Sequence, residues 1–251
     1  MKKLEVLSII PARGGSKGIP RKNIIDICGN PLVSLTIKFS LNHDLISRTV
    51  VSTDDEDIKK VSIECGSEVI DRPKNISLDS SPTEEAILHV LDYLKENEDY
   101  TPDVILLLQP TSPAREYSDV ENCLLPIISK EFNASMTITE IDAHYHPYWI
   151  KEIVDGEITS PFGRNIDDER INEIKKYHQR QLLPHTYYWK NGSIYAFTNE
   201  SFRRLKHRYG DKCAPVIIDD NRSINLDSIQ DVERLRSYLE EQNEKNNYMR
   251  H

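Results

Sequence analysis

Apolar runs of strand length alternate with amphipathic segments of helical period along most of the chain, and this alternation constrains the fold more than any other feature. The predicted strands are residues 6–10, 48–52, 68–70, 104–109, 134–138 and 192–197. The predicted helices are 32–41, 55–65 and 83–94, with a last amphipathic helix at 231–244 and a frayed polar tail at 245–251. Strand–helix–strand units of this kind build a parallel sheet covered by helices. The sequence therefore predicts an α/β protein with one main domain, residues 1–251.

In such a sheet, ligands bind beyond the carboxyl ends of the strands. The loops that follow Ile10, Ser52 and Leu108 carry the polar sequences PARGGSKG, TDDED and QPTSP. We expect the functional site in these three loops. In the second loop, Asp54 is expected either to lie near the ligand or to cap the helix that follows.

The acidic character of the chain limits the classes of partner. Its 251 residues carry a formal net charge of −9, whereas proteins that bind nucleic acid or anionic membranes present a broad basic surface. The apolar run 4–10 is too short for a secretory signal, and no run approaches the roughly 20 residues of a bilayer crossing. We expect a cytoplasmic protein without nucleic-acid or membrane partners. The four cysteines form no C-x-x-C pair, so reduced structural thiols are expected.

One loop is strongly basic in spite of that net charge. Residues 7–23, LSIIPARGGSKGIPRKN, contain three glycines and four cations, namely Arg13, Lys17, Arg21 and Lys22. Their spacing matches neither G-x-x-x-x-G-K-[ST] nor G-x-G-x-x-G. Backbone N–H groups of Gly14, Gly15 and Gly18, joined by Arg and Lys side chains, would form a polyphosphate cradle. The alternative is a solvated basic turn, and Lys17 and Arg21 are equally compatible with phosphate contact and with solvent.

Residues 142–185 interrupt the alternating pattern. Clustered His, Tyr, Trp and Pro residues are followed by the charged run NIDDERINEIKK, and the segment is too long for an ordinary connection. It is either an insertion that contacts a second subunit or a lid. We favour the subunit contact because Tyr145, Tyr148 and Trp149 are typical interface residues. The histidines 144, 146, 178 and 185 have no zinc-site spacing and are expected at the surface or interface.

Seven motifs, in order along the chain from Ile9 to about Asp231, together resemble the acylneuraminate cytidylyltransferases, or CMP-sialic acid synthetases. The motifs are PARGGSKGIPRKN, VVSTDDEDI, DRP, LLLQPTSPAR, RQLLP, NGSIY and SINLDSIQD. The family includes enzymes that activate legionaminic or pseudaminic acid, whereas the Kdo-activating relatives lack the GGSKGIPRKN run. The resemblance implies a GT-A-like, Rossmann-like nucleotidyltransferase fold and a homodimer formed through the inserted segment. It also implies transfer of CMP from CTP to the anomeric hydroxyl of an acidic nine-carbon sugar, with release of pyrophosphate.

The resemblance also implies roles for residues of the nucleotide site. Arg13 and Lys22 would contact the triphosphate, with Lys22 at the α-phosphate, and Asn23 would lie near the nucleotide. Arg72 and Ser81 would contact cytosine. Two alternatives stay open: Arg72 pairs with a surface carboxylate, or Ser80 or Ser81 caps the helix that starts near Thr83.

The acceptor and the metal are assigned in the same way. Gln109 would contact the ribose and the sugar, and Arg180 with Gln181 would bind the sugar carboxylate. Asn191 and Tyr195 either line that pocket or pack behind it, and for Tyr195 we expect packing. Ser112 and Arg115 are expected to support the turn.

SINLD departs from the family pattern, in which both polar positions are usually Asp. Asn225 and Asp227 lie two apart on a predicted strand, so both face one side, where they would hold Mg²⁺ or Mn²⁺. The expected catalytic residues are Lys22, Arg13 and Asp227. Two alternatives are a nucleotidyltransferase for another sugar or nucleotide, and a nucleotide-binding regulatory protein whose metal site Asn225 has weakened.

Overall fold

The computed structural model describes residues 4–16, 18–159, 177 and 179–248. The chain forms two compact units. The core unit consists of Met1–Ile138 and Lys190–His251, and the inserted unit is Thr139–Trp189. The predicted insertion 142–185 falls within the inserted unit.

A seven-stranded sheet forms the centre of the core unit. Its strands, in spatial order, are β11 (Cys213–Ile217), β7 (Ala134–Glu140), β10 (Tyr188–Thr198), β6 (Val104–Leu108), β1 (Val6–Pro11), β4 (Arg48–Thr53) and β5 (Glu68–Asp71). β1 is parallel to both β4 and β6, β4 is parallel to β5, and β7 is parallel to β11. β10 runs antiparallel to β6. The prediction of a mostly parallel sheet is confirmed, and every predicted strand is present.

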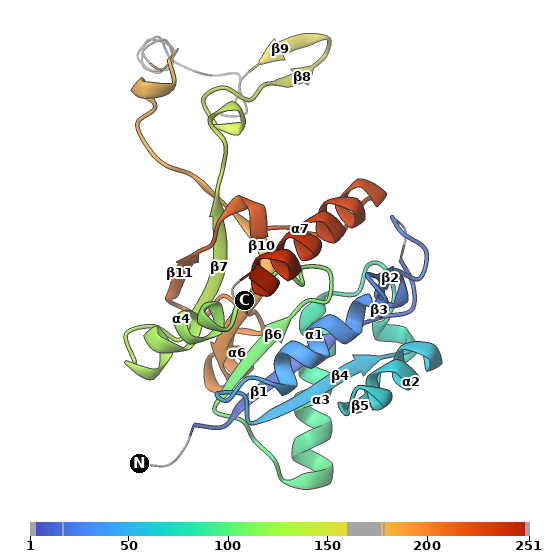
Figure 1. Cartoon of the computed structure of the whole chain (residues 1–251). Coiled ribbons are helices and arrows are strands. Elements are labelled where there is room, and N and C mark those ends of the chain that lie inside the picture. The colour runs from blue at the N-terminus through green and yellow to red at the C-terminus, as the bar shows by residue number, and fades with distance from the viewer. Residues whose placement is uncertain (1–3, 17, 160–176, 178, 249–251) are drawn as a thin grey trace. The chain divides into compact units, whose positions relative to one another are not determined.

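Helices cover both faces of this sheet (Figure 1). On one face lie α1 (Leu32–Leu41), α2 (Glu56–Glu64) and α4 (Tyr117–Ile128), which share a buried core with the strands. On the other face, α3 (Thr83–Glu98) and α6 (Asn199–Leu205) pack through Ile87, Val90, Leu91 and Phe202. The central strands are apolar on both faces because helices bury both.

The C-terminal helix α7 (Ile229–Tyr248) closes a third hydrophobic cluster. Val232 and Leu235 of α7 pack with residues around the short strands β2 (Asp26–Ile27) and β3 (Asn30–Pro31). Because this helix continues to Tyr248, the prediction of a frayed tail beginning at 245 is wrong for residues 245–248. None of the helices in the described ranges has both the length and the hydrophobicity of a membrane span.

The acidic run EYSDVE in α4 has the composition of a solvated helix face, but one of its residues is buried. Asp119 in α4 is buried, and its carboxylate accepts from both Arg222 guanidinium nitrogens, at 2.6 and 3.1 Å. It also completes a capping box with Glu116 at the start of α4. Arg222 lies in the 3₁₀ turn η5 (Asp220–Arg222), directly before the SINLD motif. This buried ion pair therefore fixes SINLD against the core.

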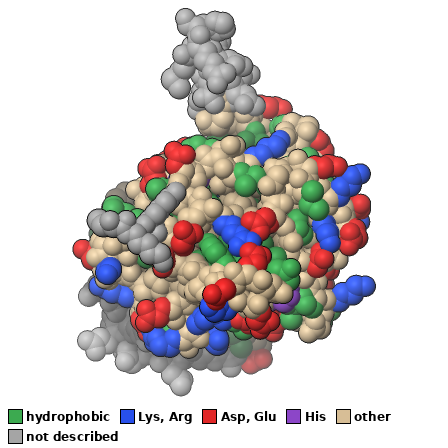
Figure 2. Space-filling view, turned by 90° about the horizontal axis from the view of Figure 1, so that it is seen from below, with side chains coloured by type: hydrophobic (Ala, Val, Ile, Leu, Met, Phe, Trp, Pro, Cys, Tyr) green, Lys and Arg blue, Asp and Glu red, His purple; other side chains and the backbone are tan. Residues whose placement is uncertain are grey.

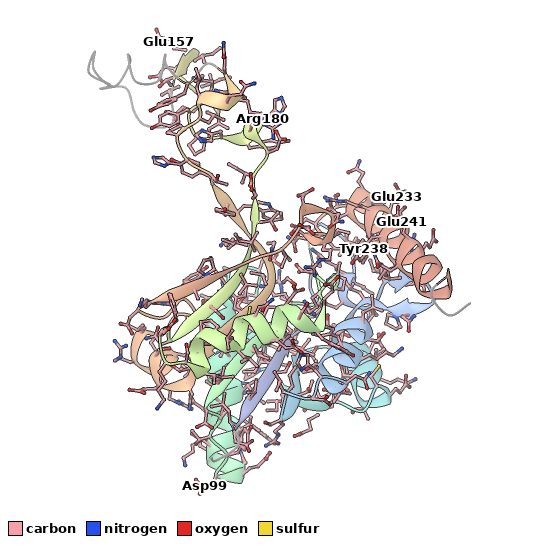
Figure 3. The ribbon with its side chains drawn as sticks, turned by 60° about the vertical axis from the view of Figure 1, so that its left-hand side comes forward. Asp99, Glu157, Arg180, Glu233, Tyr238 and Glu241 are labelled. Carbon is pink, nitrogen blue, oxygen red and sulfur yellow. The ribbon has the colours of Figure 1, made fainter. Side chains whose placement is uncertain are left out.

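The inserted unit contains a hairpin of β8 (Glu152–Val154) and β9 (Glu157–Thr159), and the 3₁₀ turns η3 (Ala143–Tyr145) and η4 (Arg180–Leu182). Figure 3 labels Glu157 on the hairpin and Arg180 on η4. His146 is buried rather than exposed, with its ring nitrogens bonded to the His185 carbonyl and the Tyr148 N–H. The NIDDERINEIKK run and His178 lie outside the described residues.

Candidate nucleotide-binding site

A cleft of about 320 Å³ lies at the carboxyl ends of the central strands of the core unit. It begins at Pro11, the last residue of β1, and at Gln109, which directly follows β6. This is the expected location. The cleft is lined by Pro11, Arg13, Gly15, Ser16, Lys22, Asn23, Arg72, Ile76, Leu78, Ser81, Pro82, Thr83, Gln109, Pro110, Thr111, Asn225 and Asp227.

Lys22 joins the basic loop to the SINLD motif. Its ammonium group donates to Asp227 Oδ1 at 3.1 Å and to the Leu226 carbonyl, and its side chain is only 12% exposed. Gly18 permits this close approach, because a Cβ there would lie 2.5 Å from the Asp227 carbonyl oxygen. The loop therefore brings Lys22 and Asp227, which are far apart in sequence, into one site.

The backbone of the basic loop is fixed by the acidic loop after β4. The Gly14 N–H donates to Asp54 Oδ1 at 3.0 Å, and Gly14 does not line the cleft, whereas Gly15 does. Asp54 does not cap α2, because the capping residue is Asp55, which accepts from the N–H groups of Asp57 and Ile58. The capping alternative for Asp54 is therefore wrong.

The cations of the basic loop differ in position. Arg13 lines the cleft and pairs with Asp79, with 2.6 Å between Nη1 and Oδ1. The Asn23 side chain donates to the Arg13 carbonyl at 2.9 Å, which fixes the loop beside the cleft. Arg21 is not among the lining residues, and its guanidinium pairs with Asp57. Lys17 lies outside the described residues.

Arg72 is a buried cation that also lines the cleft. It is 8% exposed and donates from Nε to Ser52 Oγ at 3.1 Å and from Nη2 to the Ser52 carbonyl at 2.6 Å. The alternative of a surface carboxylate partner is therefore wrong. Burial lowers the pKa of the Arg72 guanidinium to about 10, partly offset by the nearby charge of Asp54. Arg72 is still charged at neutral pH and is held in one orientation.

Ser81 also lines the cleft. Its hydroxyl accepts from the Leu78 N–H at 3.2 Å. Pro82 is the N-cap of α3, and no side chain caps that helix. The capping alternative for the serines is therefore wrong, and the Ser81 hydroxyl stabilises the loop that precedes α3.

Gln109 is positioned by two residues behind it. Gly192 has φ +76°, and a Cβ at that position would lie 2.8 Å from Gln109 Oε1, so glycine is required on both counts. Arg115 is buried and donates from Nη2 to the carbonyls of Gln109, Ser112 and Ser193. Burial lowers the pKa of Arg115 to about 9, so it remains a cation that supports this turn.

Asn225 and Asp227 share one hydrogen bond. Asn225 Nδ2 donates to Asp227 Oδ2 at 2.6 Å, and because a carboxylate can only accept, this bond fixes the amide orientation. The amide oxygen is then directed at the Ser112 hydroxyl, 3.2 Å away. Within the described residues, no group of three or more His, Cys, Asp or Glu side chains could hold a metal. Asp227, whose side chain is 70% exposed, is thus a single carboxylate able to share a cation with substrate oxygens.

The residues assigned to the sugar separate into three groups. Gln109 lines the nucleotide cleft, whereas Arg180 and Gln181 belong to the inserted unit, where Arg180 lines a separate hollow with His146 and His185. Tyr195 is buried in the core beneath the Arg208 guanidinium, which confirms the expectation of packing. Asn191 is also buried and accepts from the Thr137 hydroxyl at 2.7 Å.

Sequence reasoning missed Asp79 and the residues around it. Ile76, Leu78 and Thr83 line the cleft together with Ser81. They lie in the segment 76–83, from which only the serines were selected. The one available signal was the polar run SLDSSPTEE itself. On the face that Figure 2 shows, the Lys and Arg side chains are interspersed with Asp and Glu, which is consistent with an anion site confined to the cleft.

Comparison with known proteins connects this geometry to a family. A family model described as Cytidylyltransferase matches residues 7–245. The N-acylneuraminate cytidylyltransferase of Escherichia coli O18:K1:H7 is 26% identical over 91% of this chain and 51% of its own length. The pseudaminic acid cytidylyltransferase of Campylobacter jejuni subsp. jejuni serotype O:2 is 28% identical over 90% and 93%. The CMP-N,N'-diacetyllegionaminic acid synthase of Legionella pneumophila subsp. pneumophila is 27% identical over 90% and 92%.

The fold is also similar to that of a solved structure. A CMP:2-keto-3-deoxy-manno-octonic acid synthetase complexed with CTP matches with a TM-score of 0.66, covering 95% of this chain and 99% of that one at 18% identity. The chain spans about half of the E. coli relative and more than nine-tenths of the other two. Because the family model matches nearly the whole chain, the chain belongs to the cytidylyltransferase family.

Proposed function

We propose that the protein transfers CMP from CTP to the anomeric hydroxyl of an acidic nine-carbon 2-keto sugar and releases pyrophosphate. Family membership supports cytidylyl transfer, and relatives named for neuraminic, pseudaminic and legionaminic acids support this class of acceptor. Their identities of 26%, 28% and 27% are too similar to rank the three sugars. The form of the GGSKGIP loop favours a neuraminic or legionaminic acid.

The observation that carries the proposal is the convergence of Lys22, Arg13, Arg72 and Asp227 in one cleft. Attack of a hydroxyl on the α-phosphorus breaks the bond to the bridging oxygen of pyrophosphate and spreads negative charge over the phosphoryl oxygens. In the proposed complex, Lys22 neutralises charge at the α-phosphate and Arg13 binds the leaving phosphates. Gly15 and Asn23, which line the same wall, shape the cradle around them.

Arg72 provides a physical basis for choosing cytosine. Its bonds to Ser52 use one N–H of Nε and one of Nη2, so both N–H groups of Nη1 and the second of Nη2 are left as donors to a base. Cytosine presents acceptors at O2 and N3, whereas uracil has a hydrogen on N3 that would oppose such a donor. A fixed donor of this kind discriminates strongly, because the wrong base leaves buried polar groups unpaired.

Mg²⁺ or Mn²⁺ bound with the triphosphate would supply further neutralisation of the phosphate oxygens. The site fits such an ion only in part, because Asp227 offers one carboxylate and the Asn225 amide is bonded to Asp227 and Ser112. We propose that Asp227 would be the protein ligand of such a cation, with the remaining ligands supplied by CTP. Lys22 then leaves Asp227 for the nucleotide.

For the acceptor, we propose that Gln109 contacts the ribose and the sugar, and that Arg180 with Gln181 binds the sugar carboxylate. A guanidinium matches the geometry of a carboxylate. We further propose that two copies assemble through the inserted unit, in which Tyr145, Ile153 and Ile158 expose large side chains. Exposed aromatic and aliphatic residues of this kind are typical of interfaces.

Pyrophosphate release with each of the four nucleoside triphosphates, Mg²⁺ and a panel of nine-carbon keto acid sugars tests the proposal. Release with CTP and one or more of these sugars is the expected result. Release with another nucleotide or another sugar class would favour the alternative nucleotidyltransferase. Absence of release with every pair would favour the regulatory nucleotide-binding protein.

A further inference from the structure

Asp79 forms an ion pair with Arg13, a cation of the basic loop that lines the cleft. Its Oδ1 lies 2.6 Å from Arg13 Nη1, and the two side chains are 39% and 31% exposed. Arg13 comes from the loop after β1, whereas Asp79 comes from the segment between η2 (Lys74–Ile76) and α3. The ion pair therefore connects two loops that line the same cleft.

In this ion pair, Asp79 occupies the Arg13 guanidinium that a bound triphosphate would contact. A carboxylate and a phosphate present similar oxygens to Arg, and each favours a short charge-assisted hydrogen bond. A triphosphate that binds Arg13 has to compete with Asp79 for it. We propose that Asp79 is an internal competitor for the phosphates at Arg13, which weakens nucleotide binding and promotes pyrophosphate release; the part of this inference that concerns CTP depends on the proposed function.

The position of Asp79 distinguishes it from the other acidic residues at the loop. Asp54 holds the Gly14 N–H, and Asp57 holds Arg21, which does not line the cleft. Asp227 holds Lys22 but has its own proposed role as a metal ligand. Asp79 acts on a lining cation without having another part in the proposed reaction.

Displacement of Asp79 also affects the cleft-lining residues near it in sequence. Leu78 and Ser81 flank Asp79, both line the cleft, and the Ser81 hydroxyl accepts from the Leu78 N–H. Phosphate binding at Arg13 releases the acidic residue in the middle of this short turn. Phosphate binding at Arg13 and the arrangement of Leu78 and Ser81 are thereby coupled.

Titration calorimetry with CTP and, separately, with inorganic pyrophosphate tests this inference on the wild type, Asp79→Asn, Arg13→Ala and the double variant. Exposed ion pairs contribute little, so Asp79→Asn should tighten both ligands by only about twofold to fivefold. In the Arg13→Ala background the same substitution should have no effect, because the competition acts through Arg13. Asp71→Asn is the matched control: it removes a carboxylate paired with Lys59, and neither residue lines the cleft.

Unchanged or weaker binding of pyrophosphate by Asp79→Asn would overturn the inference. Equal tightening in the Arg13→Ala background would also overturn it, because the effect would then be one of net charge. Measurements with pyrophosphate and with CTP distinguish failure of this inference from failure of the proposed function. If pyrophosphate shows the expected cycle while CTP does not bind, the competitor role stands and the proposed function fails. If neither ligand binds the wild type, both fail.

Discussion

Replacement of Lys22 is expected to lower the rate of catalysis strongly while changing the stability of the fold only slightly. Its ammonium group contacts Asp227 and the Leu226 carbonyl in the free protein. Under the proposed function, it moves to the α-phosphate as charge develops there. Lys22→Ala should therefore remove an interaction that is stronger in the transition state than in the ground state.

The structure sets the expected size of both effects. Loss of the ion pair between Lys22 and Asp227 should lower the free energy of unfolding by only about 0–1 kcal/mol, because the Asp227 side chain is 70% exposed. Loss of one pre-organised donor to a developing anion costs about 2.7–4 kcal/mol in the transition state, or roughly 10²- to 10³-fold in kcat. Affinity for CTP should change by less than about tenfold, because Arg13 and Arg72 remain.

Steady-state pyrophosphate release, calorimetry with CTP and thermal unfolding measure the three quantities on one preparation. Lys59→Ala is the matched control, since Lys59 pairs with Asp71 outside the cleft and its loss should leave kcat unchanged. Near-normal turnover in Lys22→Ala would refute the assigned role. A loss of CTP affinity with an unchanged kcat would show that Lys22 binds nucleotide without selective stabilisation of the transition state.

Three further predictions test other parts of the site. Arg72→Ala should raise the KM for CTP and lower the CTP:UTP ratio of kcat/KM by about tenfold or more; an unchanged ratio contradicts the base contact. Asp227→Asn should nearly abolish turnover, whereas Asn225→Asp, which restores a second carboxylate, should strengthen the Mg²⁺ dependence, as a titration of activity against free Mg²⁺ would show; full activity in Asp227→Asn would mean that the metal is held elsewhere. Placing charges on the aromatic residues of 142–149 should yield monomers in sedimentation, and a monomeric wild type at micromolar concentration would contradict the proposed dimer.

The strands, the main helices and the position of the cleft could be predicted because each produces a local pattern. β6 is a continuous apolar run, and α1 has the expected bounds, since periodicity and burial agree along these segments. Gln109 follows from the same logic, because it is the first polar residue after a buried strand. The family resemblance then selected the lining residues Lys22, Arg72 and Asp227.

What could not be predicted depends on contacts between distant residues. Asp119 appears in an acidic run typical of a solvated helix, and only its pairing with Arg222, 103 residues away, makes it a buried residue. Asp79 gives no signal of its own, because its importance comes from Arg13 on another loop. The strand β11 was missed because it is a short edge strand that contains Pro215, and its side chains alternate between buried positions, Ala214 and Val216, and exposed ones.

In the proposed reaction, a sugar hydroxyl attacks the α-phosphorus of CTP in this cleft. Its most direct test uses an acceptor sugar labelled with oxygen-18 at the anomeric hydroxyl, followed by mass spectrometry of both products of the wild-type protein. The label should be in the CMP-sugar, between the sugar and phosphorus, and pyrophosphate should be unlabelled. A CMP-sugar without the label, with pyrophosphate or water carrying it, would contradict the account.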